Sequence, residues 1–199
     1  MIEARKMWEQ RLSRAILDRR GIRLLLAATA VLGGMWIAWS ATPASMTSAG
    51  AIPSPRAGFA APDFDLELLS GSQVSLRDLR GKALIVNLWA SWCPPCRAEM
   101  PALQEIYLAN RARGLEVLAV NMTYQDSREA AAAFVAEHGL DFPIGLDLTS
   151  DLARRYQLRA LPSTFFVDRQ GIIRQVIIGG PMSAATIQAA VEKILEAQP

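Results

Sequence analysis

The stretch that decides the fold is Ala83-Leu84-Ile85-Val86-Asn87-Leu88-Trp89-Ala90-Ser91-Trp92-Cys93-Pro94-Pro95-Cys96. Its first half is a short, nearly continuous apolar run, which predicts a buried strand. The two prolines suit the first positions of a helix, where a backbone N–H has no partner within the helix. We therefore expect Cys93 and Cys96, the only cysteines of the chain, at the point where a strand hands over to a helix.

Three kinds of site compete for a Cys-x-x-Cys pair. A zinc site needs about four ligands, whereas the chain has no second cysteine pair and a single histidine, His138. A purely structural disulfide between Cys93 and Cys96 would close a very short loop, which the chain-entropy model values at only about 2 kcal/mol. A reversible dithiol is favoured, because Cys-x-x-Cys within a βαβ pattern is a redox signature.

The spacing of the two cysteines predicts a different role for each. Cys93 at the helix boundary and Cys96 one turn inside share a face and reach disulfide geometry without a backbone movement. The positive end of the helix dipole favours a thiolate at Cys93 and lowers its pKa below the free value of about 8.5. Cys93 is the expected nucleophile, and Cys96 is the expected resolving thiol. The Cys93–Cys96 disulfide is the only redox group expected, with no metal and no further cofactor.

These residues resemble thioredoxin-fold proteins of the membrane-anchored TlpA/ResA type, whose members include the reductases of cytochrome c maturation. The similar segments are Ala61–Phe64, Ser75–Lys82, Val86–Pro101 and Leu161–Asp168. The resemblance implies an α/β thioredoxin fold with a mixed central sheet flanked by helices, and thiol:disulfide oxidoreductase activity. It also implies protein disulfides as substrates, such as those of apocytochrome c, and a membrane thiol carrier as electron donor.

The resemblance assigns further site residues. Pro162 matches the family's cis-proline, which presents backbone groups to a substrate strand; a trans proline that starts an edge strand is the alternative. Glu99 matches an acid that assists proton transfer at the buried thiol; a solvated glutamate near a helix N-terminus is the alternative. The expected catalytic residues are thus Cys93, Cys96 and Glu99, and the expected substrate-binding residues are Trp92, Pro94, Pro95, Leu161 and Pro162.

Asn87 departs from the pattern of ordinary thioredoxins, in which the same strand position carries a buried aspartate that moves protons for the resolving cysteine. An asparagine does not titrate, so Glu99 becomes the better candidate base for Cys96. Asn87 itself is expected to hydrogen-bond inside the core, as buried amides do. Trp89 is expected to be a packing residue.

The N-terminal part of the chain has the pattern of a membrane anchor. Residues 22–41 supply the roughly twenty apolar residues that cross a bilayer, and residues 1–23 hold seven Lys or Arg against three acidic residues. The positive-inside rule keeps this end in the cytoplasm. We expect a short basic segment at 1–21, a single-pass signal anchor in the cytoplasmic membrane at 22–41, and an extracytoplasmic catalytic domain. Cleavage after the apolar stretch, as in a signal peptide, is the alternative.

The remainder of the chain divides into a linker and one domain. Residues 42–61 are rich in Ala, Pro, Ser and Gly, which predicts a flexible tether, and residues 62–199 have a normal size for a single domain. In that domain acidic side chains slightly outnumber basic ones. This balance gives no sign of nucleic-acid binding.

The periodicity of the domain predicts the order of elements in a thioredoxin. The first expected elements are a strand at 64–68, a turn at 70–72 and a short helix capped by Ser75. Strands at 83–89 and 115–121 follow, with a helix between them that ends near Arg113. The second half holds an inserted helix ending at Gly139, a strand at 142–145, a helix at 148–156, a hairpin of 163–167 with 172–178, and a helix at 184–197. The inserted helix and strand resemble the TlpA/ResA group.

Other functions remain as alternatives. A general extracytoplasmic reductase or oxidase would use the same dithiol, and the direction of electron flow depends on its reduction potential. A thiol peroxidase would carry proline at position 86 and threonine at position 90, where this chain has Val86 and Ala90. A copper-site assembly protein would need a distant histidine beside the cysteines. A docking module without redox activity would leave the dithiol inert.

Overall fold

The computed structural model describes residues 22, 26–27, 29–33, 35–36 and 52–197. The chain forms two compact units, Met1–Thr47 and Ser48–Pro199. In the first unit the described residues are helical. Within the described ranges no helix has both the length and the apolar character needed to cross a bilayer. The expected basic segment at 1–21, half of the expected anchor at 22–41 and the first part of the expected linker lie outside the described residues.

The second unit is built around a mixed sheet of seven strands, in the order β2-β1-β5-β4-β3-β6-β7. The strands are β1 (Asp65–Leu68), β2 (Gln73–Ser75), β3 (Ala83–Trp89), β4 (Leu115–Asn121), β5 (Ile144–Leu146), β6 (Ser163–Val167) and β7 (Ile173–Ile178). β3 pairs in parallel with β4 and antiparallel with β6. The predicted α/β thioredoxin fold with a mixed central sheet is therefore confirmed.

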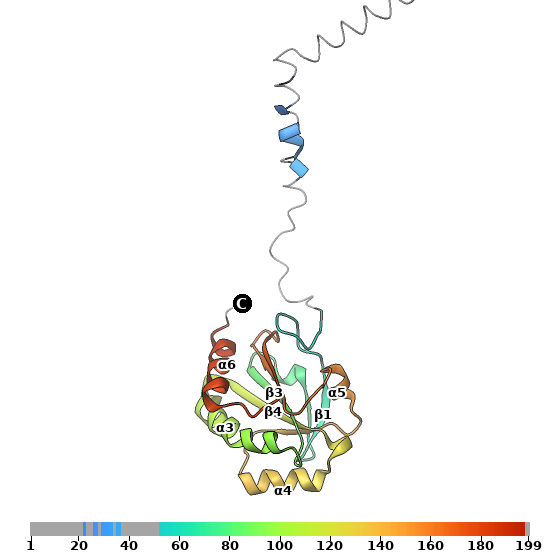
Figure 1. Cartoon of the computed structure of the whole chain (residues 1–199), viewed down its shortest axis with the longest axis vertical. Helices are drawn as coiled ribbons and strands as arrows, with labels where there is room; N and C mark the ends of the chain where they lie inside the picture. Colours follow the sequence, from blue (N-terminus) through green and yellow to red (C-terminus); the bar gives the residue numbers. More distant parts are fainter. Residues whose placement is uncertain (1–21, 23–25, 28, 34, 37–51, 198–199) are drawn as a thin grey trace, which may run out of the picture. The chain divides into compact units, whose positions relative to one another are not determined.

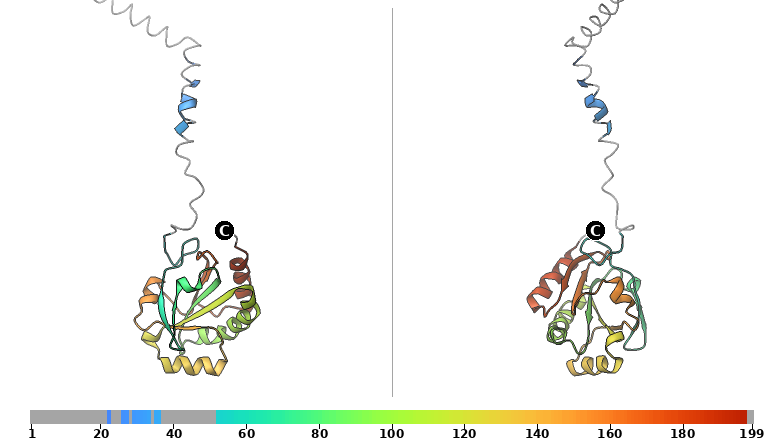
Figure 2. Two further views of the ribbon diagram at one scale, coloured as in Figure 1. Left: turned by 180° about the vertical axis from the view of Figure 1, so that it is seen from behind. Right: turned by 45° about the vertical axis from the view of Figure 1, so that its right-hand side comes forward.

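Helices cover both faces of the sheet. Figure 1 shows α3 (Pro94–Asn110) and α6 (Ala184–Glu196) side by side on one face and the short α5 (Asp151–Arg155) on the other, and the views in Figure 2 agree. The strand β3 is buried on both faces, because Ile85 and Trp89 pack in the cluster that contains α3 and α6, while Leu84, Val86 and Leu88 pack in the cluster that contains α5. The predicted packing role of Trp89, which is fully buried, is confirmed.

Caps and glycines set the ends of several elements where the sequence predicts them. Ser75 forms a capping box with Asp78 at the start of the 3₁₀ helix Leu76–Leu79, which satisfies two free N–H groups reciprocally. Ser127 caps α4 (Arg128–His138), and Gly139 ends that helix with a φ of 59°, a conformation that glycine adopts without a steric penalty. The inserted helix and strand are thus present as α4 and β5.

Two elements begin two or more residues after their predicted starts. β5 begins at Ile144 instead of residue 142, because Phe142 packs its side chain into the core and Pro143 has no N–H for a ladder. α5 begins at Asp151 instead of residue 148, because Ser150 takes a left-handed φ of 61° that interrupts a helix.

The predicted tether at 42–61 is too long at its C-terminal end. The N–H groups of Gly58 and Ala61 donate to the carbonyls of Ile173 and Gly171, and the N–H of Ile173 donates to Phe59. This segment therefore lies along the edge strand β7 as part of the domain. Its prolines do not prevent this arrangement, since proline is tolerated in extended chain at a sheet edge.

Candidate active site

The two cysteines lie at the start of α3, directly after the central strand. Cys93 is the N-cap of the helix with extended backbone angles, and its disulfide to Cys96 joins Cα atoms 5.3 Å apart. The N–H of Cys96 donates to the Cys93 sulfur over 3.4 Å. The predicted transition from strand to helix and the predicted proximity of the two sulfurs are both confirmed.

The prolines limit which backbone groups reach Cys93. Pro94 and Pro95 occupy the first two helical positions, and neither has an N–H to donate. The first backbone N–H of the helix is consequently that of Cys96, and it donates to the Cys93 sulfur. This single N–H, together with the helix dipole, is the local source of stabilisation for a Cys93 thiolate.

A shallow hollow of about 430 Å³ opens beside the disulfide. Its lining residues are Trp92, Cys93, Pro94, Pro95, Tyr124, Gln125, Leu158, Arg159, Ala160 and Leu161. Trp92 is 55% exposed at its rim, whereas Cys93 shows little surface and Cys96 none. Four of the five residues predicted to bind substrate, all except Pro162, therefore line the same hollow as Cys93.

The loop that carries Trp92 is held from the connection that follows β4. The carboxylate of Asp126 accepts hydrogen bonds from the Ser91 N–H at 2.6 Å, the Ser91 hydroxyl at 2.7 Å and the Asn121 amide at 2.8 Å. The Trp92 indole N–H donates to the Gln125 carbonyl at 3.1 Å. These hydrogen bonds between the Trp92 loop and the segment around Asp126 were not predicted. Their only signal in the sequence is the Asp126-Ser127 turn before a helix.

We expect Asp126→Asn to destabilise the domain at neutral pH by about 1–2 kcal/mol, because its NH₂ would face groups that already donate. Burial alone would raise the pKa of Asp126, but the hydrogen bonds from Asn121 and Ser91 outweigh it and lower the pKa. A lowered carboxyl pKa stabilises the fold above the ordinary value of 3.8 and loses that effect as the pH falls through the native value. Urea unfolding should therefore separate the two proteins near neutral pH and bring them together in strong acid. Asp65→Asn, at an exposed position of β1, is the matched control. An equal loss of stability in both variants would contradict the role of the Asp126 hydrogen bonds.

Glu99 is fully buried, one helical turn after Cys96. Its Oε1 accepts a hydrogen bond from the Asn87 amide at 2.9 Å, and its Oε2 accepts one from the Met182 N–H at 3.2 Å. The Asn87 amide also donates to the Thr164 hydroxyl at 2.8 Å. The alternative of a solvated glutamate is therefore wrong, and the predicted core hydrogen bonding of Asn87 is confirmed.

The environment of Glu99 favours its neutral form. Burial raises the pKa of the Glu99 carboxyl above its ordinary value, and the hydrogen bonds from Met182 and Asn87 offset only part of that effect. No cation bonds to this carboxylate among the described residues. A buried carboxyl of this kind takes up and gives up a proton closer to neutral pH than a solvated one.

Pro162 follows a cis peptide bond, as predicted, but it is buried and is not among the residues that line the hollow. Its carbonyl accepts a hydrogen bond from the Gly179 N–H at 2.8 Å. A Cβ placed on Gly180 would lie 2.8 Å from Pro162 Cγ and 2.9 Å from Glu99 Oε2. The proline, the buried acid and the Gly179-Gly180 turn thus meet at one point, and the sequence analysis missed this role of Gly180.

We expect Gly180→Ala to destabilise the domain by about 1–3 kcal/mol, because the stiff Pro162 ring and the buried carboxyl would both have to shift. Disulfide exchange at the dithiol should slow as well. Gly71→Ala, whose added Cβ meets open space at a φ of 88°, strains the backbone alone and should leave exchange unchanged. Normal stability and normal exchange in the Gly180→Ala protein would contradict this packing.

The structure brings most of the predicted site together. Cys93, Trp92 and Leu161 share the hollow, while Cys96 and Glu99 lie buried in the first turns of α3. His138 stacks on Phe134 with ring centroids 4.0 Å apart. Among the residues described, no cluster of three or more His, Cys, Asp or Glu side chains is arranged to hold a metal ion.

Comparison with known proteins assigns the chain to a family. The sequence model of the AhpC/TSA family matches residues 57–176. The thiol-disulfide oxidoreductase ResA of Geobacillus kaustophilus is 37% identical over 137 residues, which are 69% of this chain and 77% of that protein. The thioredoxin-like protein YneN of Bacillus subtilis is 39% identical over 61% of this chain and 71% of its own length.

A solved structure supports the same relationship. The thiol:disulfide interchange protein of the thioredoxin family from Chlorobium tepidum superposes with a TM-score of 0.64 at 28% sequence identity, covering 74% of this chain and 99% of that one. Fold, Cys-x-x-Cys disulfide and sequence similarity agree with one another. The chain belongs to the AhpC/TSA family, in which it is a thioredoxin-like thiol-disulfide oxidoreductase similar to ResA.

Proposed function

We propose that this protein is a membrane-anchored, extracytoplasmic reductase of selected protein disulfides, with apocytochrome c among its substrates. The observation that carries the proposal is the position of Cys93. Its sulfur accepts a hydrogen bond from the first backbone N–H of α3, and the residue borders an open hollow. The similarity to ResA supports the class of reaction. The choice of apocytochrome c rests on the resemblance to the TlpA/ResA type.

The chemistry is a pair of thiol–disulfide exchanges. The Cys93 thiolate attacks one sulfur of the substrate disulfide, and the other substrate sulfur leaves as a thiolate that takes up a proton. Cys96 then attacks the Cys93 sulfur, which releases the second substrate thiol and leaves the Cys93–Cys96 disulfide. Two electrons have passed to the substrate, and a membrane thiol donor restores the dithiol.

Glu99 serves the second exchange in this proposal. Cys96 is buried and must lose its proton before it attacks, because the thiolate is the nucleophile. The raised pKa of the nearby Glu99 carboxyl suits it to accept that proton. The substrate lies over Trp92, Pro94, Pro95 and Leu161, which line the hollow, and the cis bond to Pro162 sets the course of the chain directly after Leu161.

The location of this activity follows from the N-terminal sequence. The apolar residues 22–41 form the single-pass anchor, the basic segment before them stays in the cytoplasm, and residues after 41 lie on the far side of the membrane. Disulfides persist in such compartments. A reductase held at the membrane there meets both its electron donor and newly exported substrates.

A trapping experiment tests the proposed function. In cells that express the full-length chain with Cys96→Ala, Cys93 should hold its substrates as mixed disulfides, which are isolated from membranes and identified by mass spectrometry. We expect cytochrome c precursors among them, and the Cys93→Ala chain should capture none. Capture of varied exported proteins without cytochrome c precursors would instead assign a general reductase or oxidase.

A further inference from the structure

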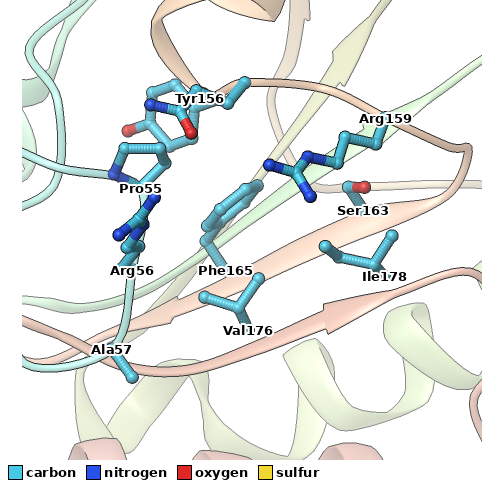
Figure 3. A pocket seen from close by; sticks show the side chains of 10 residues that line it. Pro55, Arg56, Ala57, Tyr156, Arg159, Ser163, Phe165, Val176 and Ile178 are labelled. Carbon is cyan, nitrogen blue, oxygen red and sulfur yellow. The ribbon is translucent and has the colours of Figure 1, made fainter.

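A second pocket, of about 470 Å³, lies on the sheet beside the hollow of the active site. Its floor is apolar and comes from Phe165 of β6 and from Val176 and Ile178 of β7. Figure 3 shows the Arg159 side chain extending over these strands from one side, with Arg56 on the opposite side and Phe165 between them. We call this site the arginine pocket.

The floor of the arginine pocket is open because no helix covers that part of the sheet. On this face the α-helix α5 has only five residues and packs through Leu152 and Ala153. Ile178 is left 56% exposed at the end of the edge strand. Exposed apolar surface rimmed by polar groups is typical of a binding site.

The two arginines have no counter-charge in the described structure. Several other arginines of the domain pair with carboxylates, as Arg113 does with Glu192 and Arg174 with Asp168, whereas Arg56 and Arg159 form no ion pair with the described residues. No acidic residue lines the pocket. Two unpaired guanidinium groups over an apolar floor complement a ligand that is both acidic and apolar.

The arginine pocket adjoins the reactive cysteine. Arg159 lines both this pocket and the hollow that contains Cys93. Ser163, which also lines the pocket, directly follows Pro162 and pairs with Ile178. A chain whose cysteine is joined to Cys93 therefore reaches the pocket within a few residues along the same surface.

We propose that the arginine pocket selects protein substrates in which acidic residues and an apolar side chain flank the reactive disulfide. The apolar side chain lies on Phe165 and Val176, and the carboxylates pair with Arg56 and Arg159. This inference rests on the proposed function and adds a sequence preference to it. Because the charges are solvent-exposed, the preference weakens as the salt concentration rises.

The test uses the full-length chain, reduced and held in mild detergent, and two synthetic peptides. Each peptide carries one cysteine as a mixed disulfide with thionitrobenzoate; one has Leu and Glu on both flanks, and the other has Leu and Gln. Attack by Cys93 joins the peptide to the protein and expels thionitrobenzoate, and attack by Cys96 then releases the peptide thiol. The ratio of the two second-order rate constants measures the preference.

We expect the acidic peptide to react about five- to tenfold faster at low salt, as two exposed ion pairs would provide. The double variant Arg56→Gln with Arg159→Gln should reduce this ratio to about one, and Arg56→Glu with Arg159→Glu should favour a peptide flanked by Lys. The control variant, Arg80→Gln with Arg111→Gln, removes the same charge at exposed positions outside both pockets and should keep the wild-type ratio.

Equal rates for the two peptides in the wild-type chain would overturn the inference, and so would an equal loss of preference in the control variant. Failure of the proposed function gives a different result. In that case the wild-type chain would react with the Gln peptide no faster than the Cys93→Ala chain does.

Discussion

Replacing Cys93 with alanine is expected to reduce disulfide reduction by the full-length chain about 10³-fold or more, to the background rate. Cys93 borders the open hollow and its sulfur accepts the Cys96 amide, so no other group in the described structure can make the first attack. Cys96 is the only other sulfur nucleophile of this type in the sequence, and it is fully buried. Insulin reduction, followed with a thiol donor in excess, gives the rate.

The Cys96→Ala chain is the matched control, since it loses the same number of thiols. It should fail to turn over as well, but it should still accumulate a stable mixed disulfide with a peptide substrate, visible by intact-mass measurement. The Cys93→Ala chain should form none. A Cys93→Ala chain that captures the peptide through Cys96 would reverse the two proposed roles.

Replacing Glu99 with glutamine is expected to slow the second exchange by about 10²-fold, the usual contribution of a general base. The first exchange involves Cys93 alone and should change much less. With a peptide mixed disulfide of thionitrobenzoate, stopped-flow absorbance reports the first step and the release of peptide thiol reports the second. Glu105→Gln, at an exposed position of the same helix, is the control and should leave both steps unchanged. Equal slowing of both steps by Glu99→Gln would argue for a structural role instead.

The same substitution has an effect on stability whose sign follows from the pKa of Glu99. A carboxyl whose pKa is raised by burial binds its proton more tightly in the folded state. Its favourable contribution is present below the ordinary value of 4.5 and is lost as the pH rises through the raised native value. Glu99→Gln removes this dependence, so the variant should gain stability relative to the wild type as the pH rises from the ordinary value through the raised native value, with a constant difference above it. Urea unfolding across this range measures the difference, and parallel curves for the two proteins would contradict a raised pKa.

The central part of the fold was predictable because its signals are local. β3 and β4 coincide with the predicted strands, since their apolar runs are bounded by the Cys-Pro-Pro-Cys tetrapeptide and by Gly114. The cap at Ser75 places the following 3₁₀ helix for the same reason. Periodicity and capping residues carry this information without reference to the rest of the chain.

Long-range contacts within the site were not predictable in the same way. Glu99 and Met182 are far apart in the sequence, and their hydrogen bond depends on how α3 meets the loop before α6. The contact of Gly180 with Pro162 depends on the pairing of β6 with β7, although the Gly179-Gly180-Pro181 run does signal a turn. The arginine pocket arises from Arg56 and Arg159, which only the folded domain brings to one surface.

The most direct test of the account is the rate at which each cysteine of the reduced full-length chain reacts with iodoacetamide as the pH is varied. Mass spectrometry of the digested protein assigns the modification to Cys93 or Cys96. We expect Cys93 to react first, with a midpoint below the free thiol value of about 8.5, and Cys96 to stay protected. A Cys93 midpoint at or above that value, or faster modification of Cys96, would contradict this expectation.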